Sequence, residues 1–152
     1  MQDLIKNYEE LLESEAYKNY IKDNPKAFLF ACFLTNGQRQ FDFFCDNKVI
    51  VFQGNILNEK DQLLNSEHKV EKLDIKKIKI KPEEAIATAR NVLKAHHDET
   101  DKRIVLLQKI NKEIVWNITL LTKNMNIMNV KINAVTGKIS SESFQSIFKL
   151  KK

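Results

Sequence analysis

The sequence predicts an α+β fold made of two similar units, each an amphipathic helix followed by a three-stranded antiparallel meander. Apolar residues recur with helical spacing in two separate stretches, and apolar or alternating runs divided by turn residues follow each stretch. With 152 residues, 43% hydrophobic and 30% charged, the composition is typical of a soluble globular protein. Each unit alone would be marginally stable at this size. We therefore expect the two units to fold together, sharing a core or a continuous sheet.

The first unit begins with a helix over residues 3–22, in which apolar residues recur at three- and four-residue steps. Asn24-Pro25 ends this helix, because the residue before a proline is disfavoured in the helical conformation. Asn36-Gly37 is a strong hairpin signal between the first two strands. The three strands of this meander are expected at residues 27–34, 40–46 and 48–53.

The second unit repeats this order. Pro82, Glu83 and Glu84 suit the first turn of a helix over residues 83–97, where a proline loses no hydrogen bond and carboxylates meet the positive end of the helix dipole. Its strands are expected at residues 102–110, 113–122 and 126–134. On the last two strands, the positions expected to face the core are Ile114, Trp116, Ile118, Leu120, Met128, Val130, Ile132 and Ala134.

Three stretches give weaker patterns. Residues 54–68 predict either a loop or a short helix, and residues 75–81 alternate isoleucine with lysine, as a strand with one solvated face would. Phe144, Ile147 and Phe148 lie at helical spacing. They either pack on the body or form a short amphipathic contact with a partner or an anionic membrane. The expected organisation is a first unit at 1–56, a connector at 57–74, a second unit at 75–140 and a tail at 141–152.

The second meander closes with VKINAVTGKI, an alternating strand followed by a Thr-Gly turn. With KPEEAIATA at the start of the helix and VWNITL in the middle strand, this segment resembles the PepSY domain family over about residues 78–140. Position 133 is Asn where the family usually has Asp, and the first unit lacks the Thr-Gly close, so it would be a degenerate copy. The resemblance implies a cystatin-like, PepSY-like tandem that binds or regulates other proteins, often peptidases, without being an enzyme.

The turn residues also have a direct physical interpretation. Asn133 can hydrogen-bond to the backbone of the turn, Thr136 favours extended chain, and Gly137 can adopt a positive φ without strain. We therefore interpret the turn as mainly structural. A partner could bind at an open sheet edge or in the groove between the units. The candidate contacts are Asn133, Thr136, Gly137, Lys138 and, if its indole reaches the surface, Trp116.

No residue pattern predicts catalysis or a metal site. His96 and His97 are neighbours on the predicted helix, so their side chains point about 100° apart and cannot readily hold one ion. If Asn36-Gly37 turns a hairpin, Cys32 pairs with Phe41 and Cys45 with Phe28, so the two cysteines lie on buried strands offset by about 13 Å, which exceeds the roughly 7 Å that a disulfide can span. Surface carboxylate pairs, a serine cluster without a nearby histidine and scattered glycines provide no catalytic group or phosphate loop. We expect a protein that is not an enzyme and needs no cofactor.

The net charge of +5 permits an acidic partner. The alternative function is nucleic-acid binding through a lysine-rich sheet face formed by Lys72, Lys76, Lys77, Lys79 and Lys81. Glu71 and Asp74 interrupt this run and arginine is scarce, so a solvated face is the favoured interpretation. The expected partner is therefore a protein, with peptidases as the class that the resemblance suggests.

No run of residues reaches the roughly 18 apolar positions of a membrane span, and the N-terminus lacks the apolar centre of a secretion signal. The chain as given is therefore expected in the cytoplasm. If an export or anchor segment has been removed, the expected location is the envelope or the extracellular space.

Overall fold

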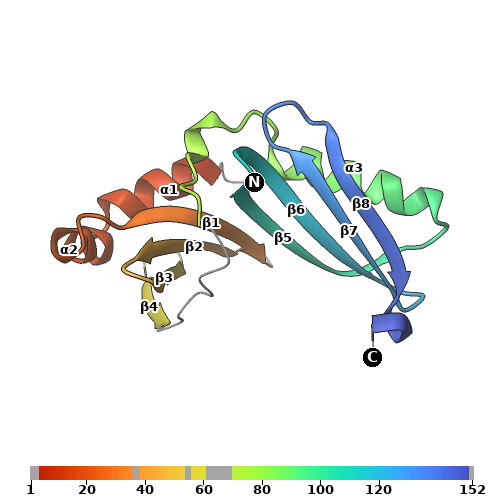
Figure 1. The fold of residues 1–152 in the computed structure, drawn as a ribbon, viewed down its shortest axis with the longest axis horizontal. Helices are drawn as coiled ribbons and strands as arrows, with labels where there is room; N and C mark the ends of the chain where they lie inside the picture. The colour runs from red at the N-terminus through yellow and green to blue at the C-terminus, as the bar shows by residue number, and fades with distance from the viewer. Residues whose placement is uncertain (1–3, 36–37, 54–55, 61–69, 151–152) are drawn as a thin grey trace. The chain divides into compact units, whose positions relative to one another are not determined.

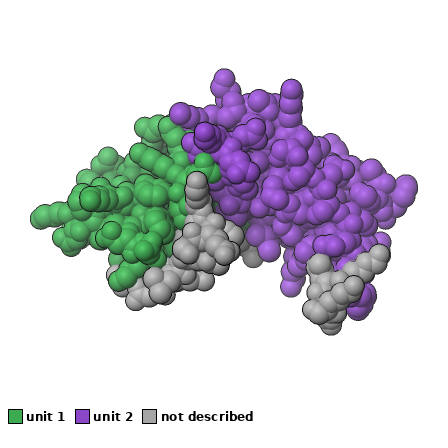
Figure 2. Space-filling view, in the orientation of Figure 1, with its two compact units in different colours: residues 1–76 green, residues 77–152 purple. Residues whose placement is uncertain are grey.

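The computed structural model describes residues 4–35, 38–53, 56–60 and 70–150. The Asn36-Gly37 turn and much of the predicted connector lie outside these residues. The chain divides into two compact units, Met1–Lys76 and Lys77–Lys152 (Figure 2). Over the described residues the fold is α+β with antiparallel strands, as the sequence predicts. No described helix is both long enough and apolar enough to cross a membrane.

Unit 1 contains two helices and four strands among its described residues. The elements are α1 (Leu4–Glu13), α2 (Glu15–Asp23), β1 (Phe28–Thr35), β2 (Gln38–Cys45), β3 (Lys48–Gln53) and β4 (Ile56–Lys60). Each strand pairs antiparallel with the next, in the order β1, β2, β3, β4 (Figure 1). The three-stranded meander predicted for this unit therefore gains a fourth strand, within residues 54–68, for which a loop or a short helix was predicted, and mostly within the predicted connector at 57–74. The sequence of β4, ILNEK, has no apolar alternation that would have identified it.

The single helix predicted over residues 3–22 is instead two helices that meet at Ser14. Ser14 Oγ accepts a hydrogen bond from Tyr17 N at 3.2 Å and donates one to the Leu11 carbonyl oxygen at 2.6 Å. A serine in this position satisfies an N–H group at the start of a new helix, so Ser14 ends α1 and caps α2. Asn24 caps the C-terminus of α2, just before Pro25, as predicted.

An aromatic cluster joins the helices of unit 1 to its strands. Tyrosines of α1 and α2 contact phenylalanines of β2 and β3, with ring centroids 5.5 to 6.5 Å apart. The tyrosines are Tyr8, Tyr17 and Tyr20, and the phenylalanines are Phe41, Phe43 and Phe52. Each of these phenylalanines is at most 1% exposed. Because aromatic rings bury large apolar surfaces, this cluster forms much of the core of unit 1.

The β1–β2 hairpin keeps the predicted register near its turn and loses it further away. Cys32 pairs with Phe41 as predicted, whereas Phe28 pairs with Phe44 and not with Cys45. A β-bulge in β1 inserts one extra residue between these two pairs and causes the slip. Both cysteines are free and buried.

Unit 2 contains one α-helix and four strands among its described residues. The elements are α3 (Pro82–Ala95), β5 (Thr100–Ile110), β6 (Glu113–Thr122), β7 (Asn126–Asn133), β8 (Ile139–Ser146) and the 3₁₀ helix η2 (Ile147–Leu150). The strands pair antiparallel in chain order, and α3 lies across one face of them, packing on β6 and β7 (Figure 1).

The core of unit 2 matches the prediction from strand alternation. The predicted inward positions of β6 and β7, from Ile114 to Ala134, are all at most 7% exposed. Helix α3 contributes its buried face, made of Pro82, Ala85, Ile86, Ala89 and Leu93. The helix and the strands thus enclose a mainly aliphatic core around the single tryptophan.

Two predictions at the edges of unit 2 are wrong. Residues 75–81 form no strand, because η1 (Ile75–Lys77) is a 3₁₀ turn and irregular chain follows it up to α3. Asp74 Oδ1 accepts a hydrogen bond from Lys76 N at 3.1 Å, which favours a turn over extended chain. Residues 141–146, predicted as part of a tail, belong to β8, so the meander of unit 2 also has a fourth strand. Phe144 lies in that strand and not in a helix.

Candidate functional site

The turn between β7 and β8 is held by its own side chains. Asn133 Oδ1 accepts hydrogen bonds from Val135 N at 2.8 Å and Thr136 N at 3.0 Å, and Thr136 Oγ1 accepts one from Lys138 N at 3.2 Å. Gly137 has a φ of +81°, a region that glycine enters without the strain a side chain would bring. The conformation of the turn therefore depends on the residue types at positions 133, 136 and 137.

Trp116 and Gly137 both meet Ile80, which lies just before α3. The Trp116 indole N–H donates a hydrogen bond to the Ile80 carbonyl oxygen at 2.9 Å, and Trp116 is 0% exposed. A Cβ atom at Gly137 would lie 3.2 Å from Ile80 Cδ1. The Ala134 carbonyl oxygen accepts hydrogen bonds from Lys79 N and Ile80 N, each at 2.9 Å. These contacts bring the candidate residues Trp116 and Gly137 together around Ile80 and connect the chain before α3 to the β7–β8 turn. Because Trp116 is fully buried, it has no surface for a partner.

The exposed part of this region is small. Thr136 and Lys138 are exposed, and Asn133 and Gly137 are half-buried. Val135 is 36% exposed and Ile139, the first residue of β8, is 42% exposed. The accessible surface near the turn therefore continues directly into β8.

The predicted lysine-rich sheet face is not present. Its five lysines are all exposed, but none of them lies on a strand. Lys76 and Lys77 belong to the turn η1, and Lys79 and Lys81 flank the fastened Ile80. The alternation that would point these side chains to one face requires an extended strand, which this segment does not form.

Strand β8 is an edge of the sheet in unit 2. Among the strands that the structure describes, β8 pairs with β7 alone. Residues 139–143 are exposed, and the strand sequence ISSESFQS has one charged residue, no lysine and no proline. Ile147 N donates to the Met125 carbonyl oxygen at 3.0 Å, so the alternation of the ladder directs the N–H groups of Glu142 and Phe144 away from β7. Such a row of outward backbone groups is a template for a further strand.

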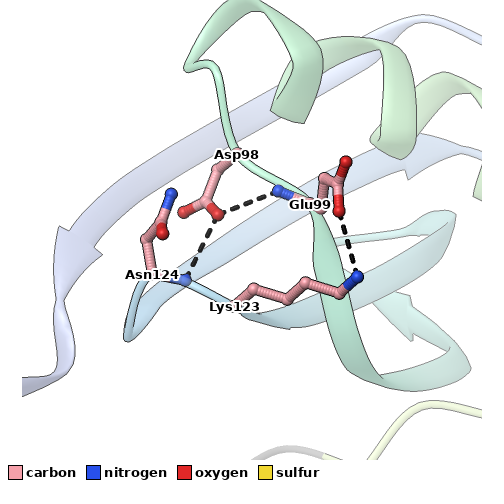
Figure 3. A network of polar contacts seen from close by, with 4 residues as sticks. All are labelled: Asp98, Glu99, Lys123 and Asn124. Carbon is pink, nitrogen blue, oxygen red and sulfur yellow. Dashed lines mark hydrogen bonds and ion pairs between the residues drawn. The ribbon is translucent and has the colours of Figure 1, made fainter.

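Asp98 connects the loop after α3 to the turn between β6 and β7 (Figure 3). Its carboxylate accepts hydrogen bonds from Glu99 N at 2.8 Å, Asn124 N at 3.4 Å and Asn126 Nδ2 at 2.9 Å. Beside it, Lys123 Nζ and Glu99 Oε2 form a surface ion pair at 3.0 Å. Asp98 is only 7% exposed, so these donors replace the water that a free carboxylate would bind.

The pKa of Asp98 reflects this environment. Burial acts to raise the pKa of the carboxyl, but hydrogen bonds from Thr122, Asn126 and the backbone N–H groups of Glu99 and Asn124 outweigh burial and lower it. A carboxylate with a lowered pKa is a poor proton donor or acceptor near neutral pH. We therefore assign Asp98 a structural role.

Two shallow hollows lined by described residues open to solvent. One of about 260 Å³ lies beside Asp98 and is lined by Arg90, Leu93, Lys94, Asp98, Glu99 and Thr100. The other, of about 480 Å³, lies along α1 and is lined by Lys6, Glu9, Glu10, Glu13 and Ser14. Neither contains a histidine or cysteine. Over the part of the chain that the structure describes, no three His, Cys, Asp or Glu side chains are grouped to hold a metal ion.

His96, the C-cap residue of α3, stacks on Phe144 of β8. The ring centroids are 4.0 Å apart and the ring planes differ by 7°. His97 follows with a φ of +55°, which ends the helix. The stacked rings connect β8 to the end of α3, so His96 has a packing role.

No family model and no curated protein sequence matches the chain. Among solved structures, the chain is similar to a protein of Clostridium difficile 630 described as a "putative lipoprotein". The two chains share 17% sequence identity with a TM-score of 0.57, over 86% of this chain and 91% of the other. At this level of identity the similarity concerns the fold alone.

Two elements of the site have only weak signals in the sequence. β8 is rich in serine, so it lacks apolar alternation, and the Thr-Gly turn before it was the one sign that a strand returns. Asp98 stands in a polar turn directly after a helix, where aspartate commonly bonds to backbone. Its partners Asn124 and Asn126 lie about one hairpin away, and only the folded sheet brings them together.

Proposed function

We propose that this protein is a non-enzymatic protein-binding module, in which a partner adds an extended segment to the free edge of β8. The observation that supports this function is the edge itself, eight residues long and exposed over residues 139–143. Natural edge strands are usually protected by lysine, proline or a covering segment. β8 contains neither residue, and an edge of this kind suits binding by strand addition.

The architecture that we propose is a PepSY-like tandem, in which unit 1 is a degenerate copy of unit 2. Both units have a helical segment followed by antiparallel strands. Asn133 Oδ1 accepts two backbone hydrogen bonds, which the aspartate usual in the family could also accept. Because PepSY proteins often restrain or assist peptidases, a peptidase is the first partner class to test. The structurally similar protein is described as a "putative lipoprotein". We therefore propose that the present protein acts in the cell envelope and not in the cytoplasm.

Proline at position 142 tests the edge directly. The Glu142 N–H points away from β7, so Glu142→Pro removes an outward donor without breaking the β7–β8 ladder. Glu142→Gln is the matched control, because it removes the charge and keeps the donor. Partners would be crosslinked and recovered from cells that make the protein. We expect Glu142→Gln to recover the same partner as the unchanged protein and Glu142→Pro to lose it. Equal recovery by both variants contradicts strand addition at β8.

The same recovery, repeated with nuclease and at increasing salt, separates this function from nucleic-acid binding. A protein partner bound by strand addition should survive nuclease and about 0.3 M salt, because backbone hydrogen bonds do not depend on counterion release. Loss with nuclease and a steep fall with salt would favour the exposed lysines, Lys72, Lys76, Lys77, Lys79 and Lys81, as the binding surface.

A further inference from the structure

The residues of β8 that offer outward backbone groups point their side chains toward α3. Glu142 and Phe144 pair with Val130 and Met128 of β7, which are fully buried in the core that α3 covers. Because residues paired across two strands project from the same face of a sheet, the side chains of Glu142 and Phe144 lie on the α3 side. A strand added to β8 would therefore place its own side chains beside these two.

The α3 side of β8 is apolar at both ends and acidic between them. Phe144 is half-buried and stacks on His96, with ring centroids 4.0 Å apart. Val92, four residues before His96 and so on the same side of α3, is also half-buried. At the other end of the strand, Ile139 is exposed and pairs with a core residue of β7. Glu142 lies between these apolar side chains and is exposed.

The described part of the chain leaves the charge of Glu142 uncompensated. No described side chain forms an ion pair or a hydrogen bond with its carboxylate. Lys131, the one lysine of β7, pairs with the residue before Glu142 and therefore points to the opposite face of the sheet. Lys138 lies four residues before Glu142, roughly 13 Å away along an extended chain. A cation brought by a partner would thus meet a carboxylate that has no counterion among the described residues.

The basic residues in the second half of α3 lie on its other side, and the end of the helix adds negative potential. Arg90 and Lys94 line the hollow beside Thr100 of β5, the strand farthest from β8 in unit 2. The last carbonyl groups of an α-helix carry a partial negative charge, which favours cations within about one turn. The stack of His96 on Phe144 places this end of α3 beside β8. The helix end and the carboxylate therefore favour a positive charge at the same edge.

We propose that the segment added at β8 is basic, with a lysine or arginine opposite Glu142 and an apolar residue two positions away beside Phe144. This inference rests on the proposed function, because it names the chemistry of the partner at that same edge. In an added antiparallel strand, the residue opposite Glu142 has its Cα about 5.5 Å away and projects from the same face, so an ion pair is within reach. A second copy of the chain that used its own β8 would not supply this cation, since ISSESFQS contains no lysine or arginine.

The net charge of the chain makes the inference discriminating. At +5, the chain as a whole attracts acidic segments. Salt screens such long-range attraction beyond about 10 Å at 0.1 M, whereas a directly opposed charge pair is screened less. A preference for a basic segment would therefore have to come from the local charge of Glu142 and the end of α3.

The test is a nuclear magnetic resonance titration of the isotope-labelled full chain with blocked peptides of the pattern Thr-Val-Thr-Xaa-Thr-Val-Thr. The central residue is lysine, glutamine or glutamate, and a valine stands two residues away on each side, so the spacing holds for both strand directions. The amide signals of Glu142 and Phe144 report binding at the edge. We expect the lysine peptide to bind about threefold tighter than the glutamine peptide, and the glutamate peptide about threefold more weakly, which is the effect of one cross-strand charge pair.

Variants at Glu142 assign the preference to this carboxylate. Glu142→Lys should reverse the order of the three peptides, and Glu142→Gln should bring them to similar affinities. The loss of about threefold for a basic segment leaves Glu142→Gln able to recover a crosslinked partner. Glu113→Lys is the matched control, because it changes the net charge by the same amount at an exposed position of β6 and should leave the order unchanged.

The inference and the proposed function fail in different ways. If the glutamate peptide binds best, or all three peptides bind equally, strand addition stands and the basic partner is overturned. If none of the peptides shifts the amide signals of Glu142 and Phe144, both are overturned. Self-association of the chain that Glu142→Pro abolishes would assign the edge to a second copy and also overturn the basic partner.

Discussion

In both units helical residues precede four antiparallel strands, but the two units fill the space between helix and strands differently. In unit 1, the helices contact the strands through tilted and edge-on aromatic rings, with Tyr8 tilted against Phe41 and Tyr17 against Phe43. In unit 2, α3 covers an aliphatic core around Trp116. The comparison shows that one layer arrangement can be built from two kinds of side chain, because burial of apolar area does not require a particular partner.

The polar contacts that the structure describes also differ between the units. Unit 2 has specific hydrogen bonds at both ends of its sheet, made by Asn133 at the β7–β8 turn and by Asp98 at the β6–β7 turn. A third set on its open face joins Asn129 to Asn117 and Thr119. In the aromatic cluster of unit 1, by contrast, the buried Tyr20 hydroxyl has no hydrogen-bond partner among the residues that the structure describes. Among the described residues, aromatic packing joins the helices of unit 1 to its strands, and directional hydrogen bonds fix the turns of unit 2.

The largest expected effects come from the two cores. Phe52→Ala in unit 1 and Trp116→Ala in unit 2 should each lower the free energy of unfolding by about 3–5 kcal/mol, because each leaves a cavity at a fully buried site. Trp116→Phe should still cost about 1–3 kcal/mol, since the Ile80 carbonyl oxygen loses its indole donor. Denaturant unfolding, followed by amide hydrogen exchange in each unit, would measure the cost of each of the three variants. A negligible cost for Trp116→Phe would contradict the importance of directional bonds in unit 2.

Gly137→Ala should lower stability by about 1–2 kcal/mol, because a side chain at a φ of +81° is strained. The new Cβ would also lie 3.2 Å from Ile80 Cδ1. Adding Ile80→Val removes that methyl group and separates the two causes. If the double variant regains part of the lost stability, the contact with Ile80 Cδ1 contributes to the loss. If it regains none, the strained backbone at position 137 is the cause. Thermal unfolding of the four proteins measures this.

Asn133→Ala should cost about 1 kcal/mol, since the N–H groups of Val135 and Thr136 lose their acceptor. Asn133→Asp should be neutral or stabilising, because a carboxylate oxygen accepts the same two bonds. Asn133→Ala removes the acceptor, whereas Asn133→Asp keeps it and removes only the amide. The pair therefore tests whether the turn needs any hydrogen-bond acceptor at position 133 or an amide in particular. Equal losses for both substitutions would show that the amide is needed. Chemical denaturation is the measurement.

The smallest expected effects on stability near neutral pH come from ionisable groups, and they become visible only in acid or alkali. Acid should destabilise unit 2, and alkali should destabilise unit 1. Asp98 has a lowered pKa, so its stabilisation of unit 2 is present above about pH 3.9, the usual value for an unfolded aspartate, and is lost as pH falls further. Burial raises the pKa values of Tyr8 and Tyr20 to about 12. The unfolded chain ionises these tyrosines from pH 10.0 upward, so unit 1 should lose stability between that pH and about 12.

Amide hydrogen exchange at acid and alkaline pH would show which unit opens first. Asp98→Asn should remove much of the acid sensitivity of unit 2, and Tyr8→Phe should reduce the alkaline sensitivity of unit 1. If unit 1 opened first in acid, the assignment of pH sensitivity to these residues would be wrong.

The helical segments and six of the strands could be predicted from the sequence, because their apolar residues recur at helical or strand spacing or form short runs between turn residues. The last strand of each unit could not, since β4 and β8 each pair with a neighbouring strand and their sequences show no apolar alternation. The break at Ser14 and the bulge in β1 also depend on single hydrogen bonds and one extra residue, which leave the apolar pattern unchanged. Among the candidate site residues, the turn at 133–138 was predictable from residue type. The burial of Trp116 and its hydrogen bond to the Ile80 carbonyl oxygen depend on tertiary packing, which residue type does not reveal.

The distribution of chromophores gives the molecule a separate optical label in each half. The single tryptophan of the chain is the buried Trp116 of unit 2, while the three tyrosines, Tyr8, Tyr17 and Tyr20, all lie on the helices of unit 1. Fluorescence excited selectively at tryptophan therefore reports on the second half, and tyrosine difference absorbance reports on the first. Melting curves from the unmodified protein that coincide would indicate one cooperative transition, and curves that separate would give each half its own midpoint without any introduced probe.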